Sequence, residues 1–124
     1  MQREIQRRPV DAGLLHLRFP VGAVVSILHR LSGIAIALLF PVGLWMLGHS
    51  LSSPAAFARI QAELASPAAR AGVGLCAWLL AHHFFAGVRH LLLDLDIGGS
   101  RRTARLSAYV VLLLGALTAL WAAL

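Results

Sequence analysis

The sequence predicts an all-α integral membrane protein with three transmembrane helices. Of its 124 residues, 59% are hydrophobic and only 13% are charged, and the mean hydropathy is +0.78. A soluble domain of this length would carry about 25% charged residues, so this chain lacks the polar face that it would need in water. The same balance excludes a disordered chain, because disordered segments are poor in apolar residues.

Three apolar runs are long enough to cross a bilayer, which requires about 20 residues. They cover residues 21–47, 68–93 and 106–124 of a single membrane domain, residues 1–124. Backbone polar groups find no water inside lipid, so each run is expected to be an α-helix. Three helices enclose little interior, which predicts a multi-subunit helix bundle. Small residues that would allow close helix contacts are Gly33, Gly43, Gly72, Gly74 and Gly115.

The connections between these runs contain helix-start and turn signals. Ser52-Ser53-Pro54 and Pro67 are typical of helix starts, so residues 55–65 are expected to form a short interfacial helix. Residues 94–105 are expected to form the second connection, with a turn at Gly98-Gly99-Ser100. The first long apolar run begins only after Phe19-Pro20 and continues too far for a signal peptide, so we expect the N-terminus to be retained.

All eleven basic residues are arginines, and the formal net charge is +6. They lie near the ends of the apolar runs, which favours a lipid bilayer over a nucleic-acid partner. An excess of arginines before the first run and in the second connection predicts a cytoplasmic N-terminus. These arginines are Arg3, Arg7, Arg8 and Arg18, followed by Arg101, Arg102 and Arg105. The lone cysteine, Cys76, excludes a thiolate cluster and is expected to be a small buried hydrophobic residue.

A first polar cluster, Ser26-Ile27-Leu28-His29-Arg30, lies in the opening turns of the first run. Ser26 and Arg30 are four residues apart and share one helix face, and His29 borders that face. These donors could bind a carbonyl or carboxylate group, which suits a quinone headgroup or a haem propionate. The alternative is a packing role, in which Arg30 snorkels to the interface and His29 hydrogen-bonds a neighbouring helix.

A second polar cluster places His83, Gly87 and His90 on one stripe of the second run. A neutral imidazole is a good haem ligand, and a glycine one turn away leaves room for a flat macrocycle. His82 points about 100° away from this stripe. A hydrogen-bonded packing role is the alternative for these histidines.

Helix geometry limits how such a haem could be held. His83 and His90 are about 10 Å apart along the helix, so they cannot bind one iron from opposite sides. The second axial ligand must be His29 or a residue of a partner subunit. The partner is the easier source, because His83 is expected to lie about two turns deeper than His29. His29 and His90, with Arg30 and Arg89, are then placed to meet the propionates.

The remaining polar and aromatic residues have simpler interpretations. Asp94 and Asp96 close the second run and are either a solvated helix end or, for Asp94, part of a proton path. His16 and His49 are expected to be interfacial. The three tryptophans are expected to anchor or pack the helices; they are Trp45, Trp78 and Trp121.

Several motifs together resemble the cytochrome b556 membrane-anchor subunit of bacterial succinate dehydrogenase, respiratory complex II. The motifs are Arg8-Pro9-Val10, Arg18-Phe19-Pro20, Ser26-Ile27-Leu28-His29-Arg30-Leu31-Ser32-Gly33, and His83 through His90 with Asp94. The resemblance covers nearly the whole chain. The patterns S-x-x-H-R-x-[ST]-G and H-x6-H-x3-D are specific when they occur together in a three-span chain.

The resemblance implies roles for individual residues. His83 matches the axial ligand of a haem b that lies between chains, with the other ligand supplied by a second small membrane-anchor subunit. The haem environment would include His29, Arg30, Gly87 and His90, and the ubiquinone site would include Ser26, Ile27 and Arg30. Asp94 matches an acid near that site. His82 departs from the family pattern, in which an aromatic residue is expected.

The resemblance also implies a place in electron transfer. Electrons from succinate would pass from a flavoprotein subunit through an iron–sulfur subunit to ubiquinone at the cytoplasmic side of the bacterial inner membrane. The chain itself would perform no succinate chemistry. The alternatives are an anchor of a quinol:fumarate reductase, with the same architecture, and a haem-free structural anchor.

Overall fold

The computed structural model describes residues 19–124, which contain four α-helices. The helices are α1 (Val21–Ser50), α2 (Pro54–Leu64), α3 (Pro67–Asp94) and α4 (Arg101–Ala123). Helices α1, α3 and α4 are each long and apolar enough to cross a membrane. The prediction of an all-α protein with three membrane-spanning helices is confirmed. His16, and the motif residues and arginines that precede Phe19, lie outside the described residues.

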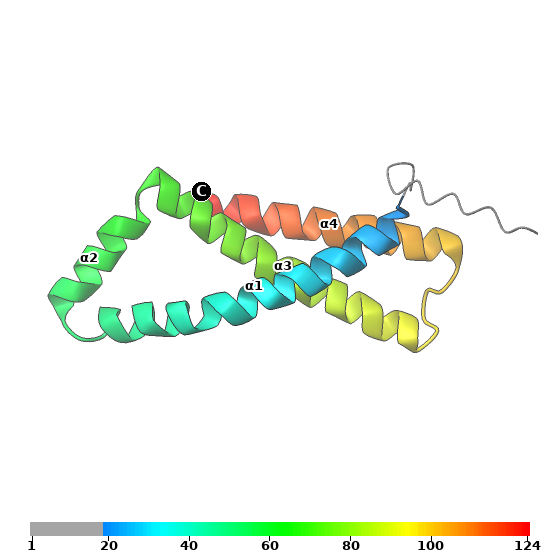
Figure 1. Ribbon diagram of the computed structural model, residues 1–124. Coiled ribbons are helices and arrows are strands. Elements are labelled where there is room, and N and C mark those ends of the chain that lie inside the picture. Colours follow the sequence, from blue (N-terminus) through cyan, green and yellow to red (C-terminus); the bar gives the residue numbers. More distant parts are fainter. Residues whose placement is uncertain (1–18) are drawn as a thin grey trace, which may run out of the picture.

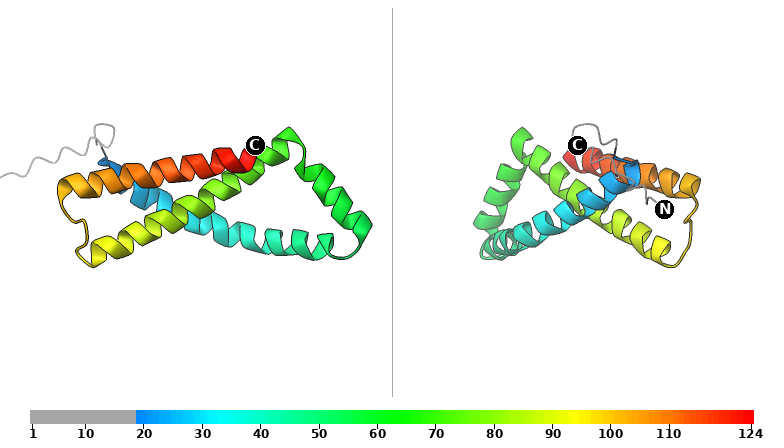
Figure 2. Two further views of the ribbon diagram at one scale, coloured as in Figure 1. Left: turned by 180° about the vertical axis from the view of Figure 1, so that it is seen from behind. Right: turned by 45° about the vertical axis from the view of Figure 1, so that its right-hand side comes forward.

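The three long helices form a crossed arrangement (Figures 1 and 2). Helices α3 and α4 pack side by side in opposite directions, whereas α1 crosses α3 and then diverges from it, and α2 joins the separated ends. A Cβ built on Gly74 of α3 would lie 3.0 Å from the backbone oxygen of Ala119 on α4, so glycine permits this close packing. Gly43 and Gly72 have open space beside them within the described residues, so close helix contacts at these two positions stay a prediction for the assembled complex.

Serine side chains cap the three later helices. Each serine oxygen accepts a backbone N–H in the first turn, which satisfies a donor that has no partner within the helix. The pairs are Ser53 with Ala56 at 3.1 Å, Ser66 with Ala69 at 3.3 Å, and Ser100 with Thr103 at 3.2 Å. The expected short helix is therefore α2. The third long helix begins before the apolar run expected at residues 106–124, because the Ser100 cap starts α4 at Arg101.

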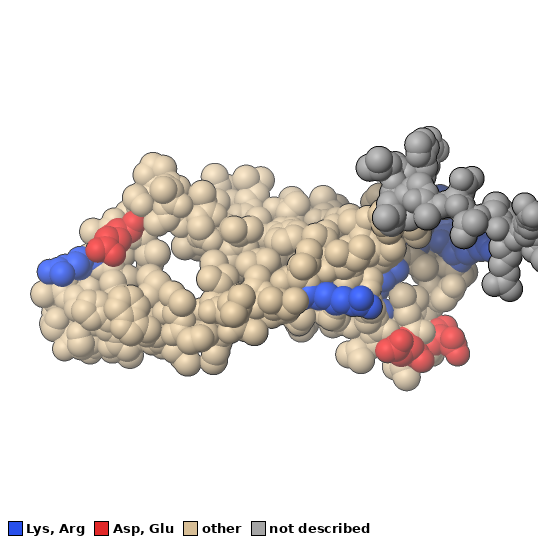
Figure 3. Space-filling view, in the orientation of Figure 1, with Lys and Arg blue, Asp and Glu red and all other residues tan. Residues whose placement is uncertain are grey.

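The early start of α4 also moves three arginines out of the second connection. Arg101, Arg102 and Arg105 lie in the first turns of α4. The apolar pattern could not show this, since a helix can continue beyond the hydrocarbon into the polar interface. Charged side chains gather at the α2 end and toward the opposite end, where α3 joins α4, with an uncharged band between them (Figure 3).

The interior of the chain is small. Its buried hydrophobic core consists of Val25, Ala86, Ala108 and Val111, and most large apolar side chains face outward. Such a surface is stable in lipid or against the helices of other subunits.

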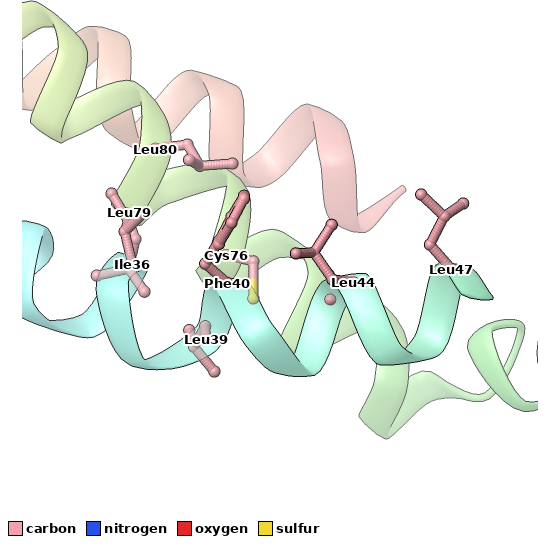
Figure 4. A pocket seen from close by; sticks show the side chains of 9 residues that line it. Ile36, Leu39, Phe40, Leu44, Leu47, Cys76, Leu79 and Leu80 are labelled. Atoms are coloured by element: carbon pink, nitrogen blue, oxygen red, sulfur yellow. The ribbon is translucent and has the colours of Figure 1, made fainter. Parts of the chain in front are cut away.

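An apolar groove opens where α1 and α3 diverge (Figure 4). It has a volume of about 320 Å³ and is lined by residues such as Phe40, Leu44 and Leu80. Cys76 also lines this groove and is exposed. The expectation that Cys76 is buried is therefore wrong for the chain alone, because Cys76 lies in the open groove between α1 and α3.

The end of α3 has the hydrogen bonds of a Schellman motif. The backbone N–H of Ile97 donates to Leu92 O at 2.9 Å, and that of Asp96 donates to Leu93 O at 3.0 Å. Asp96 adopts the left-handed conformation that this motif requires, with φ of 58°. Asp96 thus has a role in ending α3 that its sequence position did not reveal.

We expect substitutions of Asp96 to follow the cost of the left-handed conformation. Asp96→Gly should raise the melting temperature, because glycine adopts positive φ without the steric cost of about 1–2 kcal/mol that a Cβ brings. Asp96→Ala should lower it, and Asp96→Asn controls for the lost charge. Thermal unfolding of the detergent-solubilised protein, purified with its associated subunits, measures the melting temperatures of these variants. A melting temperature of Asp96→Ala at or above that of Asp96→Asn would contradict this account.

Candidate functional site

Three histidines meet where α1 crosses α3. The His29 ring of α1 stacks on His83 with centroids 4.3 Å apart and on His90 with centroids 5.1 Å apart. The interplanar angles are 14° and 22°. Because His83 and His90 are about 10 Å apart along α3, the His29 ring lies between them. The two predicted polar clusters therefore form one site.

A glycine on α3 makes room for this arrangement. A Cβ built on Gly87 would lie 3.3 Å from Nε2 of His29. The space that we expected Gly87 to leave for a flat cofactor is thus occupied by the His29 ring.

His83 is held by α1 through one edge of its ring. Its Nδ1 lies 3.1 Å from the backbone oxygen of His29 and 3.3 Å from Oγ of Ser32. A carbonyl oxygen can only accept a hydrogen bond, so Nδ1 carries the proton and donates it. The lone pair of the neutral ring is then on Nε2, which is the form that a metal-binding imidazole requires. Ser32 belongs to the first motif, three residues after His29, but no role was assigned to it from the sequence.

The predicted quinone residues lie on α1 beside this site. Ser26 is half-buried, while Ile27 and Arg30 are exposed. Arg30 directly follows His29, so a guanidinium is available at the edge of the histidine cluster. This arrangement provides a hydroxyl, a cation and an apolar side chain within a little more than one helical turn.

Two neighbouring residues on α3 have different partners. His90 Nδ1 donates to the backbone oxygen of Ala86 at 2.7 Å. Arg89 is buried and donates to Ser107 Oγ and to Ala104 O on α4, each at 3.0 Å. Arg89 therefore joins α3 to α4 in this structure, and its place near haem propionates stays a prediction.

Asp94 is the last residue of α3 and is exposed. Its position at the helix end, four residues after His90, agrees with either of its interpretations. No group of three metal-ligating side chains forms within residues 19–124. Any metal that His83 binds therefore requires further ligands from a cofactor or another chain.

His82 has a different environment from His83. Its fully buried ring stacks on Trp78 at a centroid distance of 5.1 Å and lies beside Gly115 of α4. Neither ring nitrogen has a hydrogen-bond partner among the described residues. An unpaired buried polar group costs about 1–3 kcal/mol, so His82 is a packing residue that carries a cost.

We expect His82→Phe to raise the melting temperature of the purified protein. Phenylalanine keeps an aromatic ring against Trp78 and removes two unpaired nitrogens, which should gain about 1–3 kcal/mol. Differential scanning calorimetry in detergent measures the change. A lower melting temperature would instead indicate that the ring bonds to the Val25 backbone, which lies against it.

Comparison with known proteins agrees with the resemblance seen in the sequence. Residues 4–122 match the family described as succinate dehydrogenase/fumarate reductase transmembrane subunit. The chain is 33% identical over 109 residues to the succinate dehydrogenase cytochrome b556 subunit of Coxiella burnetii, covering 85% of each chain. It is 32% identical over 96 residues to the corresponding subunit of Paracoccus denitrificans, covering 73% of this chain and 70% of that protein.

The match covers α1 to α4 and includes both histidine motifs. The name of the two relatives, cytochrome b556, implies a b-type haem in those proteins. This chain is therefore a multi-pass membrane protein that belongs to the family of succinate dehydrogenase/fumarate reductase transmembrane subunits.

Proposed function

We propose that this chain is the haem b-binding membrane-anchor subunit of a succinate:ubiquinone oxidoreductase. The observation that carries the proposal is the hydrogen bonding of His83, whose Nδ1 is engaged by α1 so that Nε2 is left to bind iron. The names of the two relatives favour succinate dehydrogenase. A quinol:fumarate reductase anchor is the second candidate, because the family description includes both enzymes.

The residues around His83 fit a shared haem. His29 and His83 stack face to face with an interplanar angle of 14°, so their nitrogens do not oppose each other across a single iron. A second small membrane-anchor subunit would supply the other haem ligand. When bound, the haem supplies one-electron transfer. His83 would bind its iron, and His29, Arg30 and His90 would bind its propionates through charge-assisted hydrogen bonds.

Ser26, Ile27 and Arg30 would form this chain's part of the ubiquinone site. The Ser26 hydroxyl and the Arg30 guanidinium would donate hydrogen bonds to the quinone oxygens, and Ile27 would contact the apolar part of the ring. Arg30 would stabilise negative charge that develops on a quinone oxygen during reduction. Asp94, exposed at the end of α3, would exchange protons with water and deliver them toward this site.

The rest of the complex would surround the chain in the bacterial inner membrane. With the N-terminus in the cytoplasm, Arg30 and His90 lie in the half of the bilayer nearer to the iron–sulfur subunit. That subunit and the flavoprotein subunit would carry electrons from succinate. The outward-facing apolar side chains would contact lipid and the second anchor subunit.

Arg30→Leu should reduce succinate:quinone reductase activity about tenfold or more, since it removes a charged hydrogen bond worth about 1.5–3 kcal/mol. Succinate oxidation by an artificial dye should remain, because that reaction does not use the membrane quinone site. Arg59→Leu, on the exposed face of α2, is the matched control. Equal loss of both activities in Arg30→Leu would contradict the quinone assignment.

The haem assignment is tested by the reduced-minus-oxidised optical spectrum of membranes that contain the chain and its partner subunits. We expect a b-type band in the wild type and in His82→Phe, and its loss in His83→Ala. The reason is that, of these two adjacent histidines, only His83 has a hydrogen-bonded Nδ1 that leaves Nε2 free for iron. Loss of the band in His82→Phe but not in His83→Ala would reverse the ligand assignment. A wild-type spectrum without the band would support the haem-free structural anchor.

A further inference from the structure

We infer that Ser32 is a positioning residue that, with the backbone oxygen of His29, fixes the tautomer and ring angle of His83 and thereby sets the reduction potential of the haem. This inference rests on the proposed function, because it concerns the haem that His83 would bind. Ser32 itself would touch neither haem nor quinone.

The hydrogen bonds of Ser32 define the direction of each proton. Its side chain is fully buried, and its hydroxyl donates to His29 O at 2.9 Å. A serine hydroxyl has one proton, and that proton is committed to the carbonyl. The lone pairs of Oγ are then available to Nδ1 of His83, 3.3 Å away. Both oxygens near Nδ1 are acceptors, so each of them favours the form of the ring that carries its proton on Nδ1.

The backbone of α1 limits the position of the same ring from a second side. A Cβ built on Gly33 would lie only 2.9 Å from Cε1 of His83. Only glycine therefore lets the imidazole lie this close to α1. The His29 ring stacks on its face at 4.3 Å. One turn of α1 thus provides the acceptors at the ring edge, the space beside it and the aromatic contact on its face.

These contacts have a chemical consequence for a bound iron. Donation of the Nδ1 proton to an acceptor makes Nε2 a stronger electron donor. A stronger donor stabilises the oxidised iron more than the reduced iron and lowers the reduction potential. Removal of one of the two acceptors should weaken this effect and loosen the ring. The potential of the haem should then become more positive.

The test is a redox titration of the b-type optical band in membranes that contain the chain with its partner subunits. Ser32→Ala should retain the band but shift its midpoint potential to a more positive value. Ser32→Thr keeps a hydroxyl at the same position and should retain the wild-type potential. Thr118→Val is the matched control, because it deletes a hydroxyl that donates to the carbonyl of Leu114 on α4 at 2.8 Å, away from His83.

The outcomes separate this inference from the proposed function. A wild-type potential in Ser32→Ala, together with loss of the band in His83→Ala, would overturn the role of Ser32 and leave the haem assignment intact. A wild type without the band would overturn the proposed function itself. If Ser32→Ala loses the haem, a normal band and potential in Ser32→Thr support the positioning role. Loss of haem in both variants would indicate a packing effect and would overturn the positioning role of Ser32.

Discussion

The crossing of α1 over α3 is the contact on which the site depends, and it is built from two reciprocal pairs. Gly33 on α1 faces the His83 ring, and Gly87 on α3 faces the His29 ring. Each glycine removes the Cβ that would keep the opposing imidazole away. Because α1 has only two buried residues, Val25 and Ser32, it has few other contacts to hold it on α3. A shift of this crossing would therefore separate the histidines and, at the same time, weaken the packing of α1 on α3.

The small interior of the chain favours the proposed sharing of the haem with another subunit. Two helices that cross once can present one edge of an imidazole to a cofactor, but they cannot enclose a macrocycle on both faces. Beyond the crossing, α1 diverges and leaves Cys76 and its apolar neighbours uncovered. Lipid or the helices of other subunits must cover these surfaces, because contact of apolar side chains with water is unfavourable. The architecture and the proposed shared haem thus follow from the same shortage of buried surface.

The sequence predicted the membrane helices and the histidine stripe but not the contacts between helices. Span length and a 3.6-residue period depend only on local composition, so α1, α3 and the face shared by His83 and His90 could be inferred. The partners of Arg89, the exposure of Cys76 and the open space at Gly43 depend on the crossing angle, which no single helix encodes. The early start of α4 was missed because the Ser100 cap was interpreted only as part of a turn.

The adjacent histidines show how α1 and α4, and not α3 alone, decide which side chain can bind a metal. His82 and His83 have the same chemistry and stand next to each other, yet the helix directs them about 100° apart. His82 enters an apolar contact with Trp78 and Gly115, where no described group orients its protons. His83 meets two oxygen acceptors on α1, which leave its outer nitrogen with a lone pair. An imidazole is prepared to bind a metal when a second group fixes its proton, and on α3 the oxygen acceptors of α1 meet His83 and not His82.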